Sequence, residues 1–309
     1  MALTKVTYVD GQTVIGATNL NAIQDEIIAN AQSLNYAMGI RPRCKNITSY
    51  YNDGTIWNRI SGTGYPAPYW DIMPGDYIKM SRAISAYNQD QTCQTTGSQY
   101  VTVASCGGLY GNGSASVVSY NHLVMVPGQG EGGTQHFGKS RMNPTNTTVG
   151  GYVGSEMFTT TLGAVTSTGS TASTATINEQ LYAEFGSHLK TTNEILSTGI
   201  NASGYNRLGT NSGCSNSLAW TDVQAVLMSE IEVYGSTVWS SSGYDTGTAK
   251  RQFELFAMSE RAINNRSAYY WLKDVASASC FCRYSSDGDA GYNSASYGYY
   301  YVRPRFVIA

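Results

Sequence analysis

Histidine is the first residue type to consider for chemistry, and this chain of 309 residues contains only His122, His136 and His188. Their spacing forms neither the His-x-x-x-His pair nor the His-Glu-x-x-His motif of a helical zinc site. The chain is rich in serine but has no Gly-x-Ser-x-Gly nucleophile elbow. His188 falls in a predicted helix, where we expect it to cap or pack rather than act as a base. We therefore expect no catalytic residues.

Cysteine and aspartate are the next candidates, because both bind metals. Six cysteines are scattered along the chain, and Cys280 and Cys282 form the closest pair. Their spacing is too short for the usual zinc pair, although on a strand both side chains would share one face. We expect free thiols. Asp287 and Asp289 could offer oxygens to calcium, but too few further oxygen ligands lie nearby. The run 287–289 instead predicts a tight turn between two strands.

A glycine-rich run at residues 128–133 matches the pattern Gly-x-Gly-x-x-Gly. A dinucleotide site needs these glycines between a strand and a helix, with the helix N-terminus facing the phosphates. Residues 134–139 are a poor helix sequence, and Glu131 would repel phosphate. The sequence therefore predicts neither a cofactor nor a metal.

A different kind of chemistry is suggested by residues 269–303, which consist mainly of Tyr, Ser, Asn, Asp, Gly and Ala. Eight of the 24 tyrosines fall between 269 and 301. Tyrosine gives large, rigid contacts and the small polar residues give adaptable hydrogen bonds, which is the composition of an antibody paratope. We predict a displayed binding surface, the alternative being a Tyr-rich hairpin that packs on a core.

Nine residues of this tract are the candidate ligand-binding residues. Aromatic anchors dominate the energy of an interface, and small polar side chains adjust its hydrogen bonds. The predicted anchors are Tyr284, Tyr292, Tyr297 and Tyr299, and the predicted polar contacts are Ser285, Asp287, Asp289, Asn293 and Ser296. Trp271 and the segment 302–308 are expected to be a buried frame beneath them.

The same tract carries a family resemblance. Trp271-Leu272-Lys273, then the variable tract, then Val302-Arg303-Pro304 and a short apolar strand resemble the end of C-type-lectin-fold domains of the formylglycine-generating-enzyme type. Phage versions of these domains are variable proteins of diversity-generating retroelements. Further similar motifs lie at 150–157, 185–189 and 227–235, so the resemblance covers roughly residues 75–309. It implies a C-type lectin-like fold in which adenine-directed mutation varies the tract.

The elements that would position this tract include several strands and two helices. Alternating or continuous apolar residues predict strands at 77–80, 100–104, 122–126, 225–234 and 302–308. In the segment 225–234, Ile231 and Val233 would face inward and Glu230 and Glu232 outward. Helices are predicted at 150–162 and 177–190, the second from a four-residue apolar repeat. Residues 166–176 and 199–222 read as polar loop segments, and 252–256 fits either a strand or a helix. The fold class expected is α+β.

The N-terminal region predicts a separate function. Thr18 is a plausible N-cap, and the seven-residue spacing of Leu20, Ile27 and Leu34 predicts a helix with a narrow apolar stripe. This stripe suits either packing on the helix's own domain or a trimeric coiled coil, with Asn30 as a polar register residue. The segment from Asp10 to Ile23 is similar to the N-termini of phage tail-fibre and baseplate proteins.

These patterns divide the chain into three parts. Residues 1–40 are predicted to attach to the virion and oligomerise, residues 41–74 to form a short loop-rich β connector, and residues 75–309 to form the ligand-binding domain. The net charge of −2 argues against nucleic acid as a partner, and no apolar run is long enough to cross a membrane. No apolar signal core is evident near the N-terminus, so we expect synthesis in the host cytoplasm and residence in the phage tail.

The sequence thus predicts a homotrimeric phage tail receptor-binding protein, which binds a bacterial surface protein or glycan and other tail proteins without covalent chemistry. Two alternatives remain. A structural virion protein would bury the Tyr-rich tract against another subunit, whereas an enzyme of the formylglycine-generating type would need a pocket lined by cysteine or metal.

Overall fold

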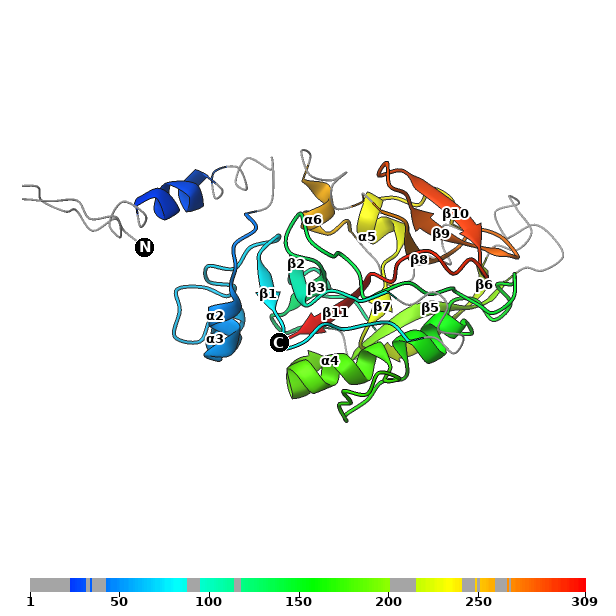
Figure 1. The fold of residues 1–309 in the computed structure, drawn as a ribbon, viewed down its shortest axis with the longest axis horizontal. Coiled ribbons are helices and arrows are strands. Elements are labelled where there is room, and N and C mark those ends of the chain that lie inside the picture. The colour runs from blue at the N-terminus through cyan, green and yellow to red at the C-terminus, as the bar shows by residue number, and fades with distance from the viewer. Residues whose placement is uncertain are drawn as a thin grey trace, which may run out of the picture.

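A computed structural model describes residues 23–31, 34, 43–87, 95–113, 118–200, 215–240, 248, 251–258, 266 and 268–309. The described chain has a mixed α and β fold in which β-sheets dominate and helices are few and short (Figure 1). The strands are β1 (Tyr77–Lys79), β2 (Tyr100–Cys106), β3 (Leu123–Pro127), β4 (Leu189–Lys190), β5 (Thr192–Ile200), β6 (Ser215–Val223), β7 (Val226–Leu227), β8 (Tyr270–Val275), β9 (Cys280–Tyr284), β10 (Ala290–Ser294) and β11 (Pro304–Ile308). The helices are α2 (Thr48–Asn52), α3 (Thr55–Ser61), the π-helix η1 (Met157–Leu162), α4 (Ile177–Phe185), the 3₁₀-helix η2 (Gly186–His188), α5 (Glu230–Tyr234) and α6 (Glu254–Ala257).

The main sheet is antiparallel and is organised around β11. Its strand order is β1-β2-β3-β11-β4, and β7 also pairs with β11. All five residues of β11 are buried, as are all five of β3. Continuous apolar runs of this kind are expected where both faces of a sheet are covered. The strands predicted at 77–80, 100–104, 122–126 and 302–308 are thereby confirmed to within a few residues.

A second antiparallel sheet carries most of the Tyr-rich tract, in the order β10-β9-β8. Trp271 and Phe281 lie in one core cluster, whereas Tyr270 and Cys282 lie in another. Adjacent residues of a strand point to opposite faces, so this sheet is packed on both sides. The predicted frame residue Trp271 is indeed fully buried, and its indole Nε1 donates to the carbonyl of Ser140 at 2.9 Å.

Helix α4 begins where the sequence predicts and ends sooner. Thr176 and Glu179 form a reciprocal capping box, and Ile177, Leu181 and Phe185 are buried. The chain then leaves the helix at Gly186, whose φ is 55°, a value that favours glycine. The predicted helix 177–190 is therefore wrong beyond Phe185, because residues 186–190 form η2 and the short strand β4.

Residues 41–74 do not form a β connector. Their described part contains α2 and α3, and Ile47, Ile56 and Ile60 are buried in the same core cluster as the main sheet. Gly54 and Gly62 bound α3 with φ values of 75° and 83°. Two of the glycines that suggested a loop instead bound a helix, whereas the prolines at 66, 68 and 74 lie in turns and bends after it.

The strand predicted at 225–234 is also wrong after Leu227. Ser229 accepts a hydrogen bond from the amide of Glu232, and the Glu232 carboxylate accepts one from the amide of Ser229, so a capping box starts α5. The burial prediction is wrong for Glu230 and Glu232, which are buried, and only Val233 of the two predicted inward residues is buried, since Ile231 is half-buried. A Ser-x-x-Glu signal therefore outweighs the alternation of apolar residues.

Two further segments differ from their predictions. Residues 150–155 form turns, and only 157–162 are helical, as a π-helix. The polar stretch 199–222 contains the end of β5 and most of β6, which pair along a nine-residue hairpin arm. Segment 252–256, which the sequence left open, contains the start of the short helix α6.

The N-terminal helix is seen in part. Residues 23–31 are helical, and the apolar side chains of Ile23, Ile27, Ile28 and Leu34 are exposed. Thr18, Leu20 and Met38 lie outside the described residues. The coiled coil and the trimer remain predictions.

A buried ionic cluster fastens β11 to its neighbours. Arg305 on β11 donates to the carboxylate of Glu194 on β5 at 2.7 and 2.5 Å and to that of Glu232 on α5 at 3.0 Å. All three side chains are at most 2% exposed. Breaking such a buried pair leaves an uncompensated charge, which destabilises strongly.

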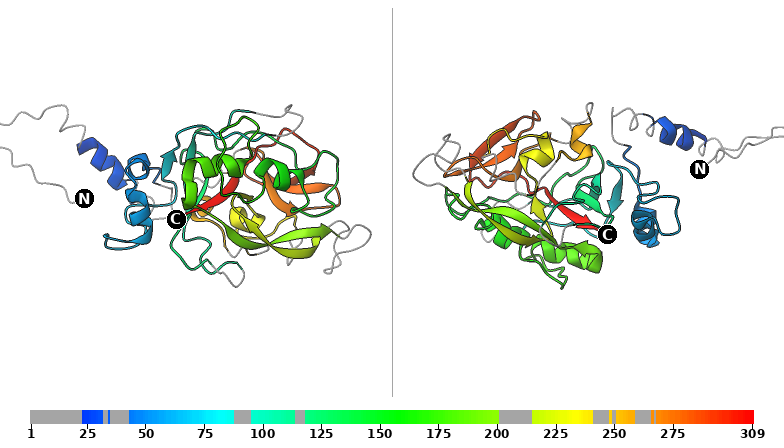
Figure 2. Two further views of the ribbon diagram at one scale, coloured as in Figure 1. Left: turned by 90° about the horizontal axis from the view of Figure 1, so that it is seen from below. Right: turned by 180° about the vertical axis from the view of Figure 1, so that it is seen from behind.

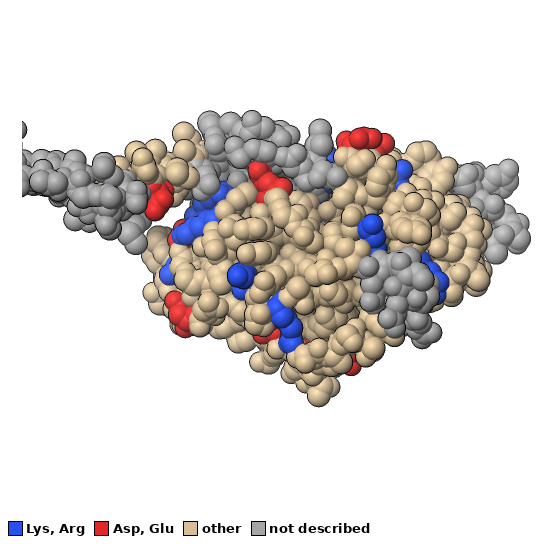
Figure 3. All heavy atoms as spheres, in the orientation of Figure 1, with Lys and Arg blue, Asp and Glu red and all other residues tan. Residues whose placement is uncertain are grey.

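The molecule is elongated, and the Tyr-rich sheet lies at one end of it. The helices α2 and α3 lie at one end in Figures 1 and 2, with the helix 23–31 beyond them, and β9 and β10 lie at the other end. Charged side chains of both signs are scattered among uncharged atoms on the face drawn in Figure 3, in keeping with a charged content of 13%.

Candidate functional site

The candidate site is built on the hairpin of β9 and β10. These strands pair in register from Cys280 opposite Ser294 to Tyr284 opposite Ala290. The tight turn expected at 287–289 is confirmed: the amide of Ser285 donates to the carbonyl of Asp289 at 3.0 Å, and Gly288 has a φ of 83°. Because both faces of this sheet are packed and the turn is short, the side chains exposed on the hairpin are held in fixed positions.

Two of the nine predicted contact residues are buried, which corrects the prediction for them. Tyr284 has no exposed surface, because its ring packs against Tyr270 at 4.6 Å between centroids and its hydroxyl faces Arg303. Burial raises the pKa of the Tyr284 hydroxyl above its ordinary value. Ser285 is 3% exposed, and its hydroxyl donates to the carboxylate of Asp289 within the turn. Both residues belong to the frame.

The other predicted residues reach the surface to different degrees. Tyr292, Tyr297 and Tyr299 are 48, 40 and 63% exposed. Asp287, Asp289 and Ser296 are exposed as well, whereas Asn293 is half-buried and its side-chain amide donates to the hydroxyl of Tyr300 at 2.7 Å. The structure does not bring them all into one patch, because Tyr292 and Asn293 are adjacent on β10 and so point to opposite faces of the sheet.

Tyr292 forms an exposed aromatic pair with Trp239, a residue that the sequence reasoning missed. The two rings meet edge-to-face at 4.9 Å, Trp239 is 47% exposed, and its Nε1 donates to the carbonyl of Ala290 at 3.2 Å. Aromatic pairs of this geometry add stabilisation beyond their buried area. The signal was present in the sequence: residues 236–244 have the same Ser, Gly and Tyr composition as the tract.

Glu230 fixes the loop that carries Trp239. Its buried carboxylate accepts hydrogen bonds from the amides of Val238, Trp239 and Ser240 at 2.8 to 3.1 Å, and another from the Ser240 hydroxyl. Charge-assisted bonds of this kind are stronger than neutral ones. The pair of Trp239 and Tyr292 is therefore held from both sides, by the hairpin and by α5.

Four other tyrosines of the tract gather on the opposite face of the hairpin. They define a second aromatic group, the tyrosine group, which consists of Tyr269, Tyr297, Tyr299 and Tyr300. Tyr269 stacks on Tyr300 at 5.2 Å and nearly parallel, and Tyr297 lies edge-on to Tyr299 at 5.6 Å and to Tyr300 at 4.7 Å. Tyr300 is 8% exposed and forms the floor, whereas the other three are 38 to 63% exposed. The group therefore offers a broad apolar contact with hydroxyls at its rim.

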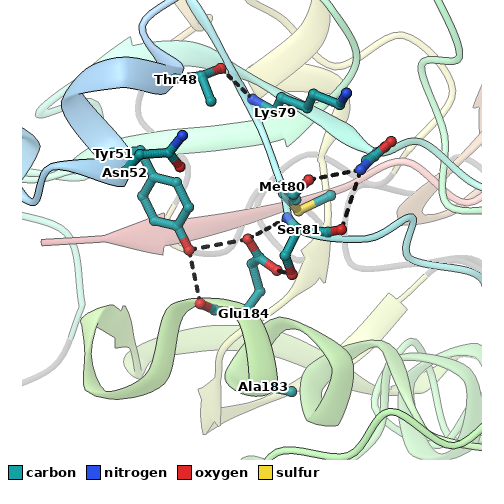
Figure 4. A pocket seen from close by; sticks show the side chains of 9 residues that line it. Thr48, Tyr51, Asn52, Lys79, Met80, Ser81, Ala183 and Glu184 are labelled. Atoms are coloured by element: carbon teal, nitrogen blue, oxygen red, sulfur yellow. Dashed lines mark hydrogen bonds between the residues drawn. The ribbon is translucent and has the colours of Figure 1, made fainter.

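A pocket of about 430 Å³ lies away from this site, between α2, β1 and the end of α4 (Figure 4). The Glu184 carboxylate accepts hydrogen bonds there from the hydroxyl of Tyr51 at 3.1 Å and from the amide of Ser81 at 2.9 Å, and also from the Ser81 hydroxyl. Burial and the nearby carboxylate raise the pKa of Tyr51 above its ordinary value. Since the Tyr51 and Ser81 hydroxyls both donate to it, the carboxylate serves as a structural junction between three elements.

The other groups considered for chemistry are also structural. His188 stacks on Trp57 at 3.6 Å, as its predicted packing role requires, and His136 stacks on Tyr301 at 3.9 Å. Cys106 and Cys280 are free thiols. Within the part of the chain that the structure describes, no three His, Cys, Asp or Glu residues gather as a metal site would need. None of the helices described there has the length and apolar character that crossing a bilayer requires.

No protein-family model matches this chain, and neither a curated protein nor a solved structure is similar to it.

Proposed function

We propose that this chain is a phage tail receptor-binding protein whose C-terminal part is a C-type lectin-like domain. It binds a bacterial surface receptor without covalent chemistry, through the exposed aromatic residues of the tract 269–303 and the adjoining Trp239. The N-terminal segment 1–40 attaches it to other tail proteins and forms a homotrimer.

One observation carries this proposal: five aromatic residues are solvent-exposed around a sheet whose own residues are packed on both faces. They are the pair Trp239 and Tyr292 and, in the tyrosine group, Tyr269, Tyr297 and Tyr299 around the floor residue Tyr300, which is only slightly exposed. Exposed aromatics that are rigidly held lose little entropy on binding and dominate interface energies. Large aromatic surfaces are seldom left in water unless they are used for contact.

The arrangement along the molecule agrees with such a function. The described N-terminal elements and the β9–β10 hairpin occupy opposite ends (Figures 1 and 2). A protein fixed to a particle by its N-terminal end would therefore hold the aromatic residues outward. In a trimer, three such surfaces would act together, so a weak single-site affinity would become strong overall binding.

The proposal is tested with the fluorescently labelled full-length chain on a panel of bacterial strains. The variant pairs Trp239→Ala/Tyr292→Ala and Tyr297→Ala/Tyr299→Ala should each weaken binding to the strain that is recognised by about 30-fold or more, since anchor residues contribute at least about 2 kcal/mol. The control pair Tyr110→Ala/Trp70→Ala removes aromatics that are 62 and 43% exposed on other elements and should bind normally.

One other result would count against the proposal. If both tract variants bound bacteria as well as the control pair but prevented assembly of tail particles, a structural tail protein would explain the surface better. Diversification has its own check: DNA near the gene should contain a reverse transcriptase gene and a near-copy of the sequence encoding 271–303 that differs almost only at adenines.

A further inference from the structure

Arg283 lies beside Tyr269 and Tyr300 of the tyrosine group. In the sheet it is opposite Gly291 on β10 and Trp271 on β8, so it lies on the face that carries the tyrosine group. Its guanidinium carbon is 5.1 Å from the ring centroid of Tyr269 and 6.0 Å from that of Tyr300. Cations over aromatic faces are attracted by the ring quadrupole.

Glycine at 291 leaves the space for this arrangement. A Cβ atom at that position would lie 2.7 Å from the guanidinium carbon of Arg283 and 2.9 Å from both terminal nitrogens. The guanidinium therefore lies flat across the backbone of β10, with the tyrosine rings beside it. Any other residue at 291 would push it away.

Part of the hydrogen-bonding capacity of this guanidinium is unused. Its Nε and Nη1 atoms are buried and have no hydrogen-bond partner among the described residues. The described residues provide no carboxylate within ion-pair distance of Arg283. On the same hairpin, the carboxylate of Asp289 accepts a hydrogen bond from the Ser285 hydroxyl. Charged donors that are buried without a partner are costly and rare. A bound ligand that accepts hydrogen bonds from them would remove this cost.

We propose that Arg283 binds an anionic group of the receptor, a carboxylate or a phosphate on an acidic surface polysaccharide, while the exposed tyrosines pack on the adjoining sugar rings. This inference rests on the proposed receptor-binding function and specifies its ligand class. A guanidinium attracts both oxyanions and binds them through charge-assisted hydrogen bonds. The ring of Tyr269 lies beside the guanidinium, and Tyr297 and Tyr299 extend the aromatic surface through Tyr300, which suits the flat face of a sugar ring.

The test measures binding of the full-length chain to three immobilised polymers by biolayer interferometry. Hyaluronan supplies carboxylates, poly(glycerol phosphate) supplies phosphates, and dextran is neutral. We expect binding to at least one anionic polymer and not to dextran, weakened by added salt because the attraction is electrostatic. The polymer that binds identifies the oxyanion. Equal binding to all three, or to none, overturns the inference.

Two variants separate the role of Arg283 from that of the fold. Arg283→Gln should weaken binding to the anionic polymer by about 10-fold or more, the effect expected for a hydrogen-bonded charged group. Gly291→Ala keeps the charge but displaces the guanidinium, and it should weaken binding to a similar extent. Lys79→Gln, which removes an exposed positive charge near α2, is the matched control and should bind like the parent chain. Unchanged binding in the first two variants overturns the inference.

Failure of this inference can be told from failure of the proposed function with the bacterial panel. If Arg283→Gln binds bacteria normally while Tyr297→Ala/Tyr299→Ala does not, the receptor-binding function stands and the anionic ligand class is wrong. If neither variant affects binding to bacteria, both proposals are wrong.

Discussion

Replacing Glu194 by Gln should destabilise the protein at neutral pH and remove part of its sensitivity to acid. Burial alone would raise the pKa of Glu194, but the charge of Arg305 and the hydrogen bonds that Arg305 donates at 2.7 and 2.5 Å outweigh it and lower the pKa to about 2. The ordinary value is 4.5. A pKa lowered by this much corresponds to about 3 kcal/mol of stability, to order of magnitude.

The pH range of this effect follows from the direction of the pKa change. A carboxyl group whose pKa is lower in the folded state stabilises the fold fully above its unfolded pKa, and this stabilisation is lost as the pH falls through the folded pKa. The contribution of Glu194 is therefore present above about pH 5 and lost by about pH 2. In Glu194→Gln this contribution is absent at every pH.

Urea unfolding followed by circular dichroism at several pH values between 2 and 7 measures the effect. We expect the variant to lose about 3 kcal/mol at pH 7 and to change less than the parent chain between pH 5 and 2. The control Glu254→Gln removes a carboxylate that is 36% exposed and lies 3.4 Å from the 51% exposed Arg251, and it should cost less than about 1 kcal/mol. A Glu194→Gln protein as stable as the parent at pH 7, with the same acid profile, would refute the reasoning.

Three more predictions concern the frame. Trp271→Ala should cost about 3 to 5 kcal/mol in urea unfolding, because a fully buried indole is lost together with its hydrogen bond to Ser140. Ser229→Ala should cost about 1 kcal/mol in the same assay, since it removes half of the capping box with Glu232; an unchanged midpoint would show that the cap is dispensable. Burial, with smaller contributions from nearby positive charges, lowers the pKa of His136 from 6.5 to about 4, so His136 loses stabilisation as the pH falls from about 6.5 to about 4. His136→Gln should flatten the stability profile in that range and leave the range below pH 4 unchanged.

The parts of the fold that the sequence predicts are those with a strong local signal. The strand at 302–308 is a continuous apolar run interrupted by Arg305, and Trp271 is a large residue in a β-rich segment. The turn at 287–289 follows from its glycine and two aspartates, because such residues tolerate turn conformations. Helix α4 follows from its four-residue repeat. Each of these features is determined by residues close together in the sequence, so it can be predicted from the sequence alone.

The errors fall where distant partners decide the outcome. Glu230 and Glu232 looked exposed because charged residues are seldom buried unless they are paired. The partner of Glu232 is Arg305, 73 residues away, and the partners of Glu230 are the amides of residues 238–240. No local pattern predicts either contact. The capping box at Ser229 was readable and was missed, because the segment also alternates like a strand.

The candidate site also combines features that the local sequence predicts with features that tertiary contacts decide. Its composition identifies the tract, but composition does not tell which tyrosines face water. Tyr284 and Tyr292 both lie on the hairpin strands, and one is fully buried whereas the other is 48% exposed. The difference arises because Tyr284 lies on the middle strand, beneath Tyr270, and Tyr292 lies on the edge strand β10. Strand order within a sheet is set by tertiary structure, which the tract alone does not specify.

The place of β11 has a consequence for how variants of this protein survive. The strand lies in the middle of the main sheet but follows the tract in the chain, so β3 and β4 cannot be joined until translation has passed residue 308. A stop codon or a shifted reading frame anywhere in 269–303 removes the strand that closes the sheet, and we expect such a chain not to fold. Amino-acid replacements at exposed tract positions leave it intact. Folding therefore selects against truncated variants. Only chains translated through the whole tract and β11 are expected to fold.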